Sequence, residues 1–286
     1  ASIGPGAMNM VTPAALATIN RIPVLLLPGD SYTTRRQGPV LQQLEHPLGP
    51  DISVNDAFRP ISRYFDRITR PEQLLYSLPA AFRVLANPVE TGAVVISLPQ
   101  DLQSHAFDFP AEFFEERIWK IRRPEPARDD IAAVAALIKS AKKPVIIAGG
   151  GVIYSEARAE LEALANATGI PVAETFGGKG AVQNAGPWHL MGLGLEGSPQ
   201  TNKLVAQADL ILSVGTRLTD FATGSQSMFQ NPDVKFASIN ITEHDAIKQG
   251  AVPVLGDAKI SLAALKDAVA GYSIPADWKS AIETGT

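Results

Sequence analysis

The residues with the clearest potential for chemistry lie in three glycine turns that follow predicted strands. They are Gly149-Gly150-Gly151, Gly215-Thr216-Arg217 and Gly256-Asp257. Glycine lets a backbone approach a phosphate closely, and the N-terminus of a helix offers free N–H groups to an anion. The guanidinium of Arg217 could pair with a diphosphate. The three turns are therefore a candidate nucleotide pocket.

The glycine run that starts at Gly149 is an incomplete nucleotide motif. A dinucleotide fingerprint has the pattern G-x-G-x-x-G, and here Tyr154 occupies the position of the third glycine. A partial motif carries little weight by itself. The alternative that these glycines only make tight turns therefore stays open.

The other reactive side chains do not form a set that could do chemistry together. The chain has no cysteine, which excludes disulfides, thiolate metal sites and a cysteine nucleophile. None of the four histidines has a second histidine at the spacing of metal ligands; they are His46, His105, His189 and His244. No G-x-S-x-G motif is present. The sequence therefore predicts no metal site and no catalytic residue within this chain.

The composition is that of a folded, slightly acidic protein. Of its 286 residues, 45% are hydrophobic, and the formal net charge is −4. An acidic balance disfavours nucleic-acid binding. The apolar runs are much shorter than the roughly 20 residues that span a membrane, and residues 1–10 do not resemble a signal peptide. We therefore expect a cytoplasmic protein that binds a small-molecule substrate, and neither nucleic acid nor a membrane.

Residues 128–275 predict a Rossmann-like domain. Short apolar strands alternate with amphipathic helices, a pattern typical of a parallel sheet covered on both faces. The predicted strands span residues 144–148, 170–174, 209–214, 234–241 and 252–255. The predicted helices span residues 129–141, 155–168, 198–207 and 258–270. Ligands bind such sheets at the carboxyl ends of the strands, where the glycine turns lie.

Residues 1–110 predict an α/β domain with few strands. We expect a helix from about residue 13, a strand apolar on both faces at 23–27, a helix at 71–86 and a strand at 92–98. Residues 29–68 have weak periodicity. Two strands make a poor doubly wound sheet, so we expect an incomplete domain whose earlier strands lie upstream of residue 1. A small two-layer unit is the alternative. Residues 111–127 are expected to be a linker, and 276–286 the start of a second one.

Several motifs, in order, resemble one enzyme family. The segment from Gly4-Pro5-Gly6 through Asn9 to Thr12 is similar to the G-P-G-A-T-N-x-V-T segment of thiamine-diphosphate enzymes of the acetohydroxyacid synthase type. That segment belongs to the end of the family's pyrimidine-binding domain. The motifs of the family's central domain follow in order, including Thr168-Gly169-Ile170-Pro171-Val172 and Gly215-Thr216-Arg217. The resemblance implies a complete central domain after the tail of a pyrimidine-binding domain.

Four further stretches resemble one subgroup of this family most closely. They span residues 20–30, 39–46, 54–60 and 63–68. The subgroup hydrolyses a C–C bond in a trihydroxycyclohexane-1,2-dione during myo-inositol catabolism. The resemblance therefore implies that the parent protein is a hydrolase of this kind. An acetolactate-synthase-like transferase and a non-catalytic nucleotide-binding or interaction module remain as alternatives.

The resemblance also implies cofactors, thiamine diphosphate and Mg²⁺, in the parent. Gly4, Pro5, Gly6 and Asn9 would line the pyrimidine side of the pocket, and the family's catalytic glutamate would lie upstream of this chain. The family's G-D-G motif for diphosphate and Mg²⁺ has no match, since Asp30 and Asp257 are each followed by another residue type. We therefore expect this chain alone to bind neither cofactor.

Departures from the family refine these expectations. Met8 replaces a common Thr or Ser, and Asp30 stands where synthases commonly have Gln. The G-M-H-G of flavin-binding synthases is Gly194-Leu195-Glu196-Gly197 here, and a carboxylate beside a flavin diphosphate argues against FAD. The resemblance also implies a homo-oligomeric parent, either a dimer or a tetramer.

Overall fold

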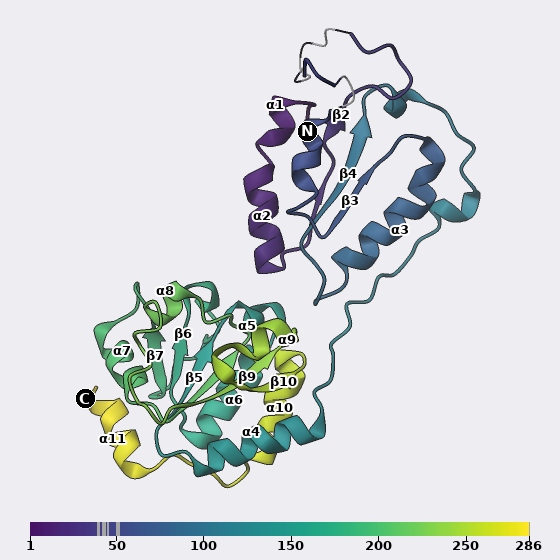
Figure 1. Cartoon of the computed structure of the whole chain (residues 1–286). Coiled ribbons are helices and arrows are strands. Elements are labelled where there is room, and N and C mark those ends of the chain that lie inside the picture. Colours follow the sequence, from purple (N-terminus) through teal and green to yellow (C-terminus); the bar gives the residue numbers. More distant parts are fainter. Residues whose placement is uncertain (39–40, 42–43, 45, 50–51, 286) are drawn as a thin grey trace. The chain divides into compact units, whose positions relative to one another are not determined.

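The computed structural model describes residues 1–38, 41, 44, 46–49 and 52–285. The chain forms two compact units, Ala1–Arg122 and Arg123–Thr286. Each unit has a parallel sheet with helices packed against it (Figure 1). The expected α/β class with parallel sheets is therefore confirmed. In the part of the chain that the model describes, no helix is both long and apolar enough to cross a membrane.

The sheet of unit 2 has six parallel strands in the order β10-β9-β8-β5-β6-β7. Its strands are β5 Pro144–Ala148, β6 Val172–Glu174, β7 His189–Gly192, β8 Leu210–Val214, β9 Lys235–Asn240 and β10 Val252–Leu255. Its longer helices are α4 Arg128–Ser140, α6 Arg158–Thr168, α7 Pro199–Ala206, α10 Ala258–Ala268 and α11 Ala276–Thr284. Its shorter helical turns are α5 Gly150–Tyr154, η5 Phe176–Gly178, α8 Asp220–Thr223, α9 Glu243–Ala246 and η6 Lys248–Gly250.

Local signals in the sequence explain where these elements begin and end. Every residue of β5 and of β8 is buried, as expected for parallel strands covered on both faces. Ser198 caps α7 by accepting a hydrogen bond from the N–H of Thr201. Gly169, with φ 73°, ends α6 in the left-handed conformation that favours glycine. The helices bury their apolar faces in one continuous core.

Unit 2 differs from the sequence prediction in several elements, including its short helices α8 and α9. Strand β7 was not predicted, and the Gly150–Gly151 part of the glycine run begins the short helix α5. The expectation that a linker starts at residue 276 was wrong, because residues 276–284 form α11. Trp278 of this helix is 2% exposed, and its indole N–H donates to the carbonyl of Pro144 at 3.1 Å. Burial of a large aromatic side chain makes α11 part of unit 2.

Unit 1 has a smaller parallel sheet centred on one long strand. Its strands are β1 Val24–Leu26, β2 Gly29–Asp30, β3 Tyr64–Arg67 and β4 Ala93–Pro99. Strand β4 pairs with each of the other three. The helices are α1 Pro5–Met8, α2 Val11–Asn20 and α3 Leu74–Leu85. The described residues of unit 1 also form the 3₁₀ turns η1 Val54–Phe58, η2 Pro71–Gln73, η3 Leu102–Ser104 and η4 Ala111–Phe114.

Strand β2 continues β1 along the same side of β4. Leu26 is paired with Val95 and Gly29 with Leu98, so both strands keep one register. Strand β3 pairs on β4 as well, and it lies in the stretch for which the sequence predicted no element. The expectation of two strands was therefore wrong. Its four residues are all half-buried and include two charged side chains, so no apolar run marks this strand.

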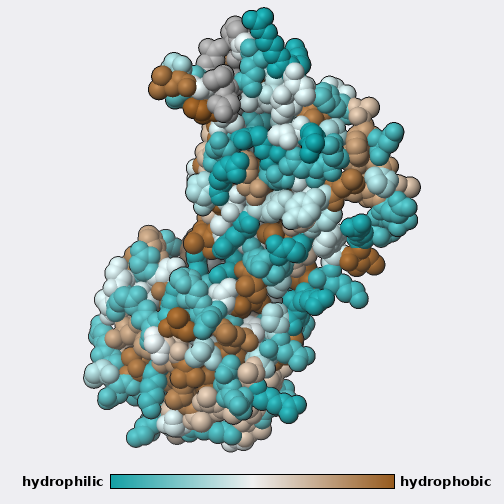
Figure 2. Space-filling model, turned by 45° about the vertical axis from the view of Figure 1, so that its right-hand side comes forward, coloured by the Kyte–Doolittle hydropathy of each residue, from teal (hydrophilic) through white to brown (hydrophobic). Residues whose placement is uncertain are grey.

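The first strand of unit 1 is less buried than the sequence predicted. Leu25 in β1 is 36% exposed and Leu27 just after it is 45% exposed. Leu16 and Ile19 on α2 are 58% and 56% exposed. Apolar side chains lie among polar ones on the surface drawn in Figure 2. Of the motif at residues 39–46, positions 39, 40, 42, 43 and 45 lie outside the described residues.

Candidate functional site

The segment that resembles the pyrimidine-side motif forms a turn into a short helix. Gly4 has φ 63° and ψ −129°, a conformation that side chains other than glycine rarely adopt. Pro5 and Gly6 start α1, and Asn9 lies exposed at its end. These four residues therefore form one turn and the short helix that follows it.

A buried carboxylate lies close to this turn in the fold. Helix α1 packs against η1, and the N–H of Gly29 donates to the carbonyl of Ala1 at 2.8 Å. Asp30 follows Gly29 at the carboxyl end of β2 and is only 3% exposed. In open α/β sheets this edge is where ligands bind. The pyrimidine-side turn and Asp30 therefore belong to the same region of unit 1.

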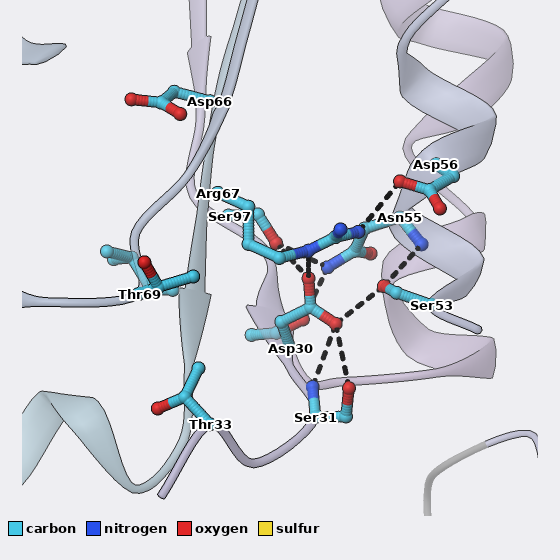
Figure 3. Close-up of polar contacts among 12 residues, drawn as sticks. Asp30, Ser31, Thr33, Ser53, Asn55, Asp56, Asp66, Arg67, Thr69 and Ser97 are labelled. Atoms are coloured by element: carbon cyan, nitrogen blue, oxygen red, sulfur yellow. Dashed lines mark hydrogen bonds and ion pairs between the residues drawn. The ribbon is translucent and has the colours of Figure 1, made fainter. Parts of the chain in front are cut away.

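Four residues donate hydrogen bonds to the carboxylate of Asp30 (Figure 3). Its Oδ1 accepts from the hydroxyl of Ser53 at 2.5 Å and from the N–H of Ser31 at 2.8 Å. Its Oδ2 accepts from the hydroxyl of Ser97 at 2.5 Å and from Nε of Arg67 at 2.7 Å. These donors come from four different segments of unit 1. Burial raises the pKa of Asp30, but the hydrogen bonds from Ser53, Ser97 and Arg67 outweigh it and hold the pKa below its ordinary value.

Asn55 and Asp56 extend this network along η1. The amide nitrogen of Asn55 donates to the carbonyl of Gly29 at 2.8 Å and to the hydroxyl of Ser97 at 2.9 Å. Nη2 of Arg67 donates to Oδ1 of Asp56 at 2.8 Å. The guanidinium of Arg67 therefore links a buried carboxylate to a half-exposed one. Asp30 and Asp56 bind the guanidinium of Arg67 from two sides, and these contacts fix its orientation at the carboxyl edge of the sheet.

Asp101 organises the backbone that leaves β2. Its carboxylate accepts hydrogen bonds from the backbone N–H groups of Thr33, Thr34 and Arg35, at distances between 2.7 and 3.1 Å. The hydroxyl of Thr34 also donates to it, at 2.8 Å. Burial raises the pKa of Asp101, but these donors outweigh it and hold the pKa well below its usual range. The carboxylate of Asp101 thus fixes the backbone of residues 33–35, near the start of the segment after β2.

The candidate nucleotide turns pack against each other in unit 2. A Cβ atom on Gly149 would collide with Gly215 and with Thr216, and a Cβ atom on Gly151 would lie 2.5 Å from Cα of Gly215. The N–H of Gly151 donates to the carbonyl of Gly215 at 2.9 Å. These contacts give Gly149, Gly151 and Gly215 a role in packing two backbone turns together. Nucleotide binding stays a prediction at Gly149, Gly150, Gly151, Gly215, Thr216, Arg217, Gly256 and Asp257.

The third turn has structural contacts of its own. The carboxylate of Asp257 accepts from the N–H groups of Lys259 and Ile260 and so caps α10. Its Oδ2 also lies 3.0 Å from Nη1 of Arg123, and its N–H donates to the carbonyl of Pro124. A Cβ atom on Gly256 would lie 3.0 Å from the backbone nitrogen of Pro126. The residues 123–126 thus cover this turn.

A hollow in the described part of unit 2 lies away from the three glycine turns. It has a volume of about 770 Å³ and is lined by α7 and by the segments around Gly194 and Met228. Its charged lining residue is Lys203. The sequence did not single out this region, apart from the departure at residues 194–197. None of the residues that line the hollow belongs to the three glycine turns.

The histidines and carboxylates do not assemble a metal centre within the described residues. No group of three or more His, Asp or Glu side chains there could hold a metal ion. Nε2 of His189 lies 3.0 Å from Oε2 of Glu174, and Glu174 also accepts from the N–H groups of Gly180 and Val182. The contacts of Glu174 therefore fix the segment between β6 and β7. Among the described residues, no group of three or more carboxylate or imidazole side chains would hold the Mg²⁺ of thiamine diphosphate. The pyrimidine-side role of Gly4, Pro5, Gly6 and Asn9 stays a prediction.

Comparison with known proteins gives a family model and a set of relatives. Residues 131–265 match the family model described as "Thiamine pyrophosphate enzyme, central domain". The chain is 48% identical, over 99% of its length, to a Bacillus cereus (strain AH820) protein named 3D-(3,5/4)-trihydroxycyclohexane-1,2-dione hydrolase. It is equally similar to the protein of that name from Bacillus thuringiensis (strain Al Hakam). Another hydrolase of this name, from a second Bacillus cereus strain, is 50% identical over 92% of the chain. The chain spans 45% of the first of these relatives and 41% of the last.

Proposed function

We propose that the chain is part of a C–C hydrolase of the thiamine pyrophosphate enzyme family, whose central-domain model matches residues 131–265. The proposed substrate is 3D-(3,5/4)-trihydroxycyclohexane-1,2-dione, the compound in the relatives' name. The observation that carries the proposal is the 48% identity over 99% of the chain, which includes both units. The reaction would belong to myo-inositol catabolism.

Thiamine diphosphate is the cofactor that we propose for this enzyme, with Mg²⁺. When bound, the cofactor supplies a carbon nucleophile and an electron sink for cleaving a C–C bond beside a carbonyl. Gly4, Pro5, Gly6 and Asn9 would lie against its pyrimidine ring. The conformation of Gly4 and the exposed end of α1 support this assignment. The described residues hold no carboxylate set for Mg²⁺, so we propose that this chain alone does not bind the cofactor.

The partners and location follow from the same proposal. We propose a homo-oligomer, and exposed apolar side chains on α2, on β1 and directly after β1 support it, because a second copy of the chain would remove such side chains from water. They are Leu16, Ile19, Leu25 and Leu27. The absence of cysteine fits the proposed cytoplasmic location.

A chimera would test the activity directly. The chain would replace the matching 45% of the Bacillus cereus relative, and the product would be assayed with Mg²⁺ and thiamine diphosphate. We expect a ring-opened acid from the dione and no acetolactate from pyruvate. Acetolactate formation by a chimera that melts cooperatively would replace the proposal with the transferase. The unmodified relative serves as the positive control.

Calorimetry of the chain would test its own binding properties. We expect no saturable heat with thiamine diphosphate and Mg²⁺, and micromolar binding would show that the chain holds its own diphosphate site. ADP and FAD would be titrated in the same way. Saturable binding of either by the chain, lost in Gly151→Ala, would favour the nucleotide-binding module at the glycine turns.

A further inference from the structure

A group of charged residues at the carboxyl edge of the unit 1 sheet has no role in the proposed function so far. Asp56 lies in η1, Arg59 follows the last residue of η1, and Arg67 is the last residue of β3. Nε of Arg59 lies 2.9 Å from Oδ1 of Asp56, and Nη2 of Arg67 lies 2.8 Å from the same oxygen. One carboxylate oxygen thus holds two guanidinium groups. We refer to these three residues as the Asp56 triad.

Several polar atoms of the Asp56 triad have no hydrogen-bond partner among the described residues. Among the residues that the structure describes, none forms a hydrogen bond with Oδ2 of Asp56, with Nη1 of Arg67 or with the two terminal nitrogens of Arg59. The side chains of Asp56 and Arg59 are 49% and 56% exposed. The triad therefore offers one acceptor and several donors next to each other, within reach of solvent.

The charges of the region cancel. Arg67 also pairs with buried Asp30, at 2.7 Å, so two carboxylates balance the two guanidinium groups. Because the net charge of these four side chains is zero, they would attract an anion only weakly. A hydroxyl both donates and accepts, so neighbouring hydroxyls are matched by a carboxylate oxygen that lies beside guanidinium N–H groups. The chemistry of the triad therefore favours a neutral ligand with adjacent oxygens.

The surroundings keep the triad in place and close to the pyrimidine-side turn. The guanidinium of Arg59 lies 4.4 Å from the ring centroid of Phe65, which limits where this side chain can go. Asp30 fixes Nε of Arg67, as described above. Since α1 packs against η1, the triad and the turn at Gly4 lie at the same edge of unit 1. Fixed donors of this kind need little ordering when a ligand arrives.

We propose that the Asp56 triad binds two adjacent oxygens of a neutral, polyhydroxylated ring. Asp56 accepts a hydrogen bond from one hydroxyl through Oδ2, while Arg59 and Arg67 donate to the neighbouring oxygen. The inference rests on the proposed function, because a trihydroxylated cyclic dione is such a ring. It names the residues that would distinguish this substrate from pyruvate, which has no hydroxyl groups to pair with Asp56.

The test is an NMR titration of the whole chain with myo-inositol, a neutral ring polyol. The chain is labelled with ¹⁵N-arginine, and the Nε–H signals of Arg59 and Arg67 are assigned with Arg59→Lys and Arg67→Lys. We expect both signals to shift saturably with myo-inositol and not with cyclohexanol or acetate. The signal of Arg70 is the internal control, since this exposed residue lies 3.4 Å from Glu72 in a separate ion pair. Asp56→Asn should weaken binding about tenfold, as expected for loss of one hydrogen bond to a charged group.

Three results would overturn the inference. They are no saturable shift with myo-inositol, an equal shift with acetate, and unchanged affinity in Asp56→Asn. Glu72→Gln is the matched variant and should bind like the unmodified chain. The titration needs neither cofactor nor turnover. An active chimera without polyol binding would therefore remove this site and keep the proposed function, whereas polyol binding with an inactive chimera would do the opposite.

Discussion

The carboxyl edges of the two sheets are built from different kinds of residue. In unit 2, β5 and β8 stay buried and mostly apolar to their last residues, and the turns after them are glycines packed against each other. In unit 1, β2 ends in Asp30 and β3 ends in Arg67, while β4 places Ser97 opposite Arg67. Burying charged groups is costly unless they are paired. The turns after β5 and β8 are therefore shaped by close backbone packing, whereas the ends of β2 and β3 are shaped by a buried charged network.

The largest expected effect is loss of the Trp278 side chain from unit 2. Trp278→Ala should lower the free energy of unfolding by about 3–5 kcal/mol, because it leaves a cavity in the core and removes the hydrogen bond to Pro144. The measurement is guanidinium unfolding of unit 2 followed by the fluorescence of Trp188, which is 4% exposed.

The matched variant of this experiment is Trp119→Ala in unit 1. Trp119 is 39% exposed and stacks on Phe82 with ring centroids 5.9 Å apart, so its loss should cost only about 1 kcal/mol. The cost would be read from the circular dichroism melt of unit 1. Equal effects of the two tryptophans would contradict the assignment of α11 to the core of unit 2.

The next effect concerns the buried carboxylate of unit 1. Asp30→Asn should lower the free energy of unfolding by about 2–3 kcal/mol. An amide has only one acceptor oxygen, so it cannot accept both from Ser53 and Ser31 on one side and from Ser97 and Arg67 on the other. Trp119 fluorescence reports the unfolding of unit 1. Asp267→Asn is the control, since Asp267 is 80% exposed and should change stability by less than about 0.5 kcal/mol. A stable Asp30→Asn variant would mean that the network contributes little to folding.

Acid should affect unit 1 through Asp101. The pKa of this carboxyl is well below its usual range in the folded chain, while the unfolded value is about 3.9. Its stabilising contribution is therefore complete above about pH 4 and is lost as the pH falls through the folded-state pKa. Asp101→Asn should cost about 1.5 kcal/mol at pH 7, and the difference from the unmodified chain should shrink below pH 4. A difference that stays constant down to pH 2 would exclude this role for the charge.

The sequence predicts much of unit 2 because its signals are local. Apolar runs mark β5 and β8, and Ser198 and Gly169 mark the ends of helices at the residues where the structure places them. Strand β7 was not predicted, and neither was α11, whose polar sequence after Pro275 resembles a linker. Its place in the core depends on Trp278 reaching Pro144, a contact 134 residues away along the chain.

The candidate site of unit 1 could not be predicted because its partners are distant in the sequence. Asp30 is separated from Ser97 by 67 residues and from Arg67 by 37. The sequence did single out Asp30, as a departure from the glutamine of related synthases. No local pattern connects it with Arg67, because β3 is short and half-buried throughout. The turn at Gly4 was predictable, because its conformation depends on the glycine itself.

The smallest expected effect separates distance from burial within unit 1. Nη1 of Arg83 lies 2.6 Å from Oε2 of Glu90, as close as Arg67 is to Asp30, but these side chains are 58% and 51% exposed. Solvent screens an exposed pair, so a double-mutant cycle with Arg83→Ala and Glu90→Ala should give a coupling of about 0.2–1 kcal/mol that falls at 1 M salt. The same cycle on Arg67 and Asp30 should give a larger coupling that changes less with salt, since Asp30 is 4% exposed. Equal coupling energies would mean that burial does not strengthen the Arg67–Asp30 pair relative to the exposed Arg83–Glu90 pair. The buried carboxyl edge would then not differ in energy from the surface of unit 1.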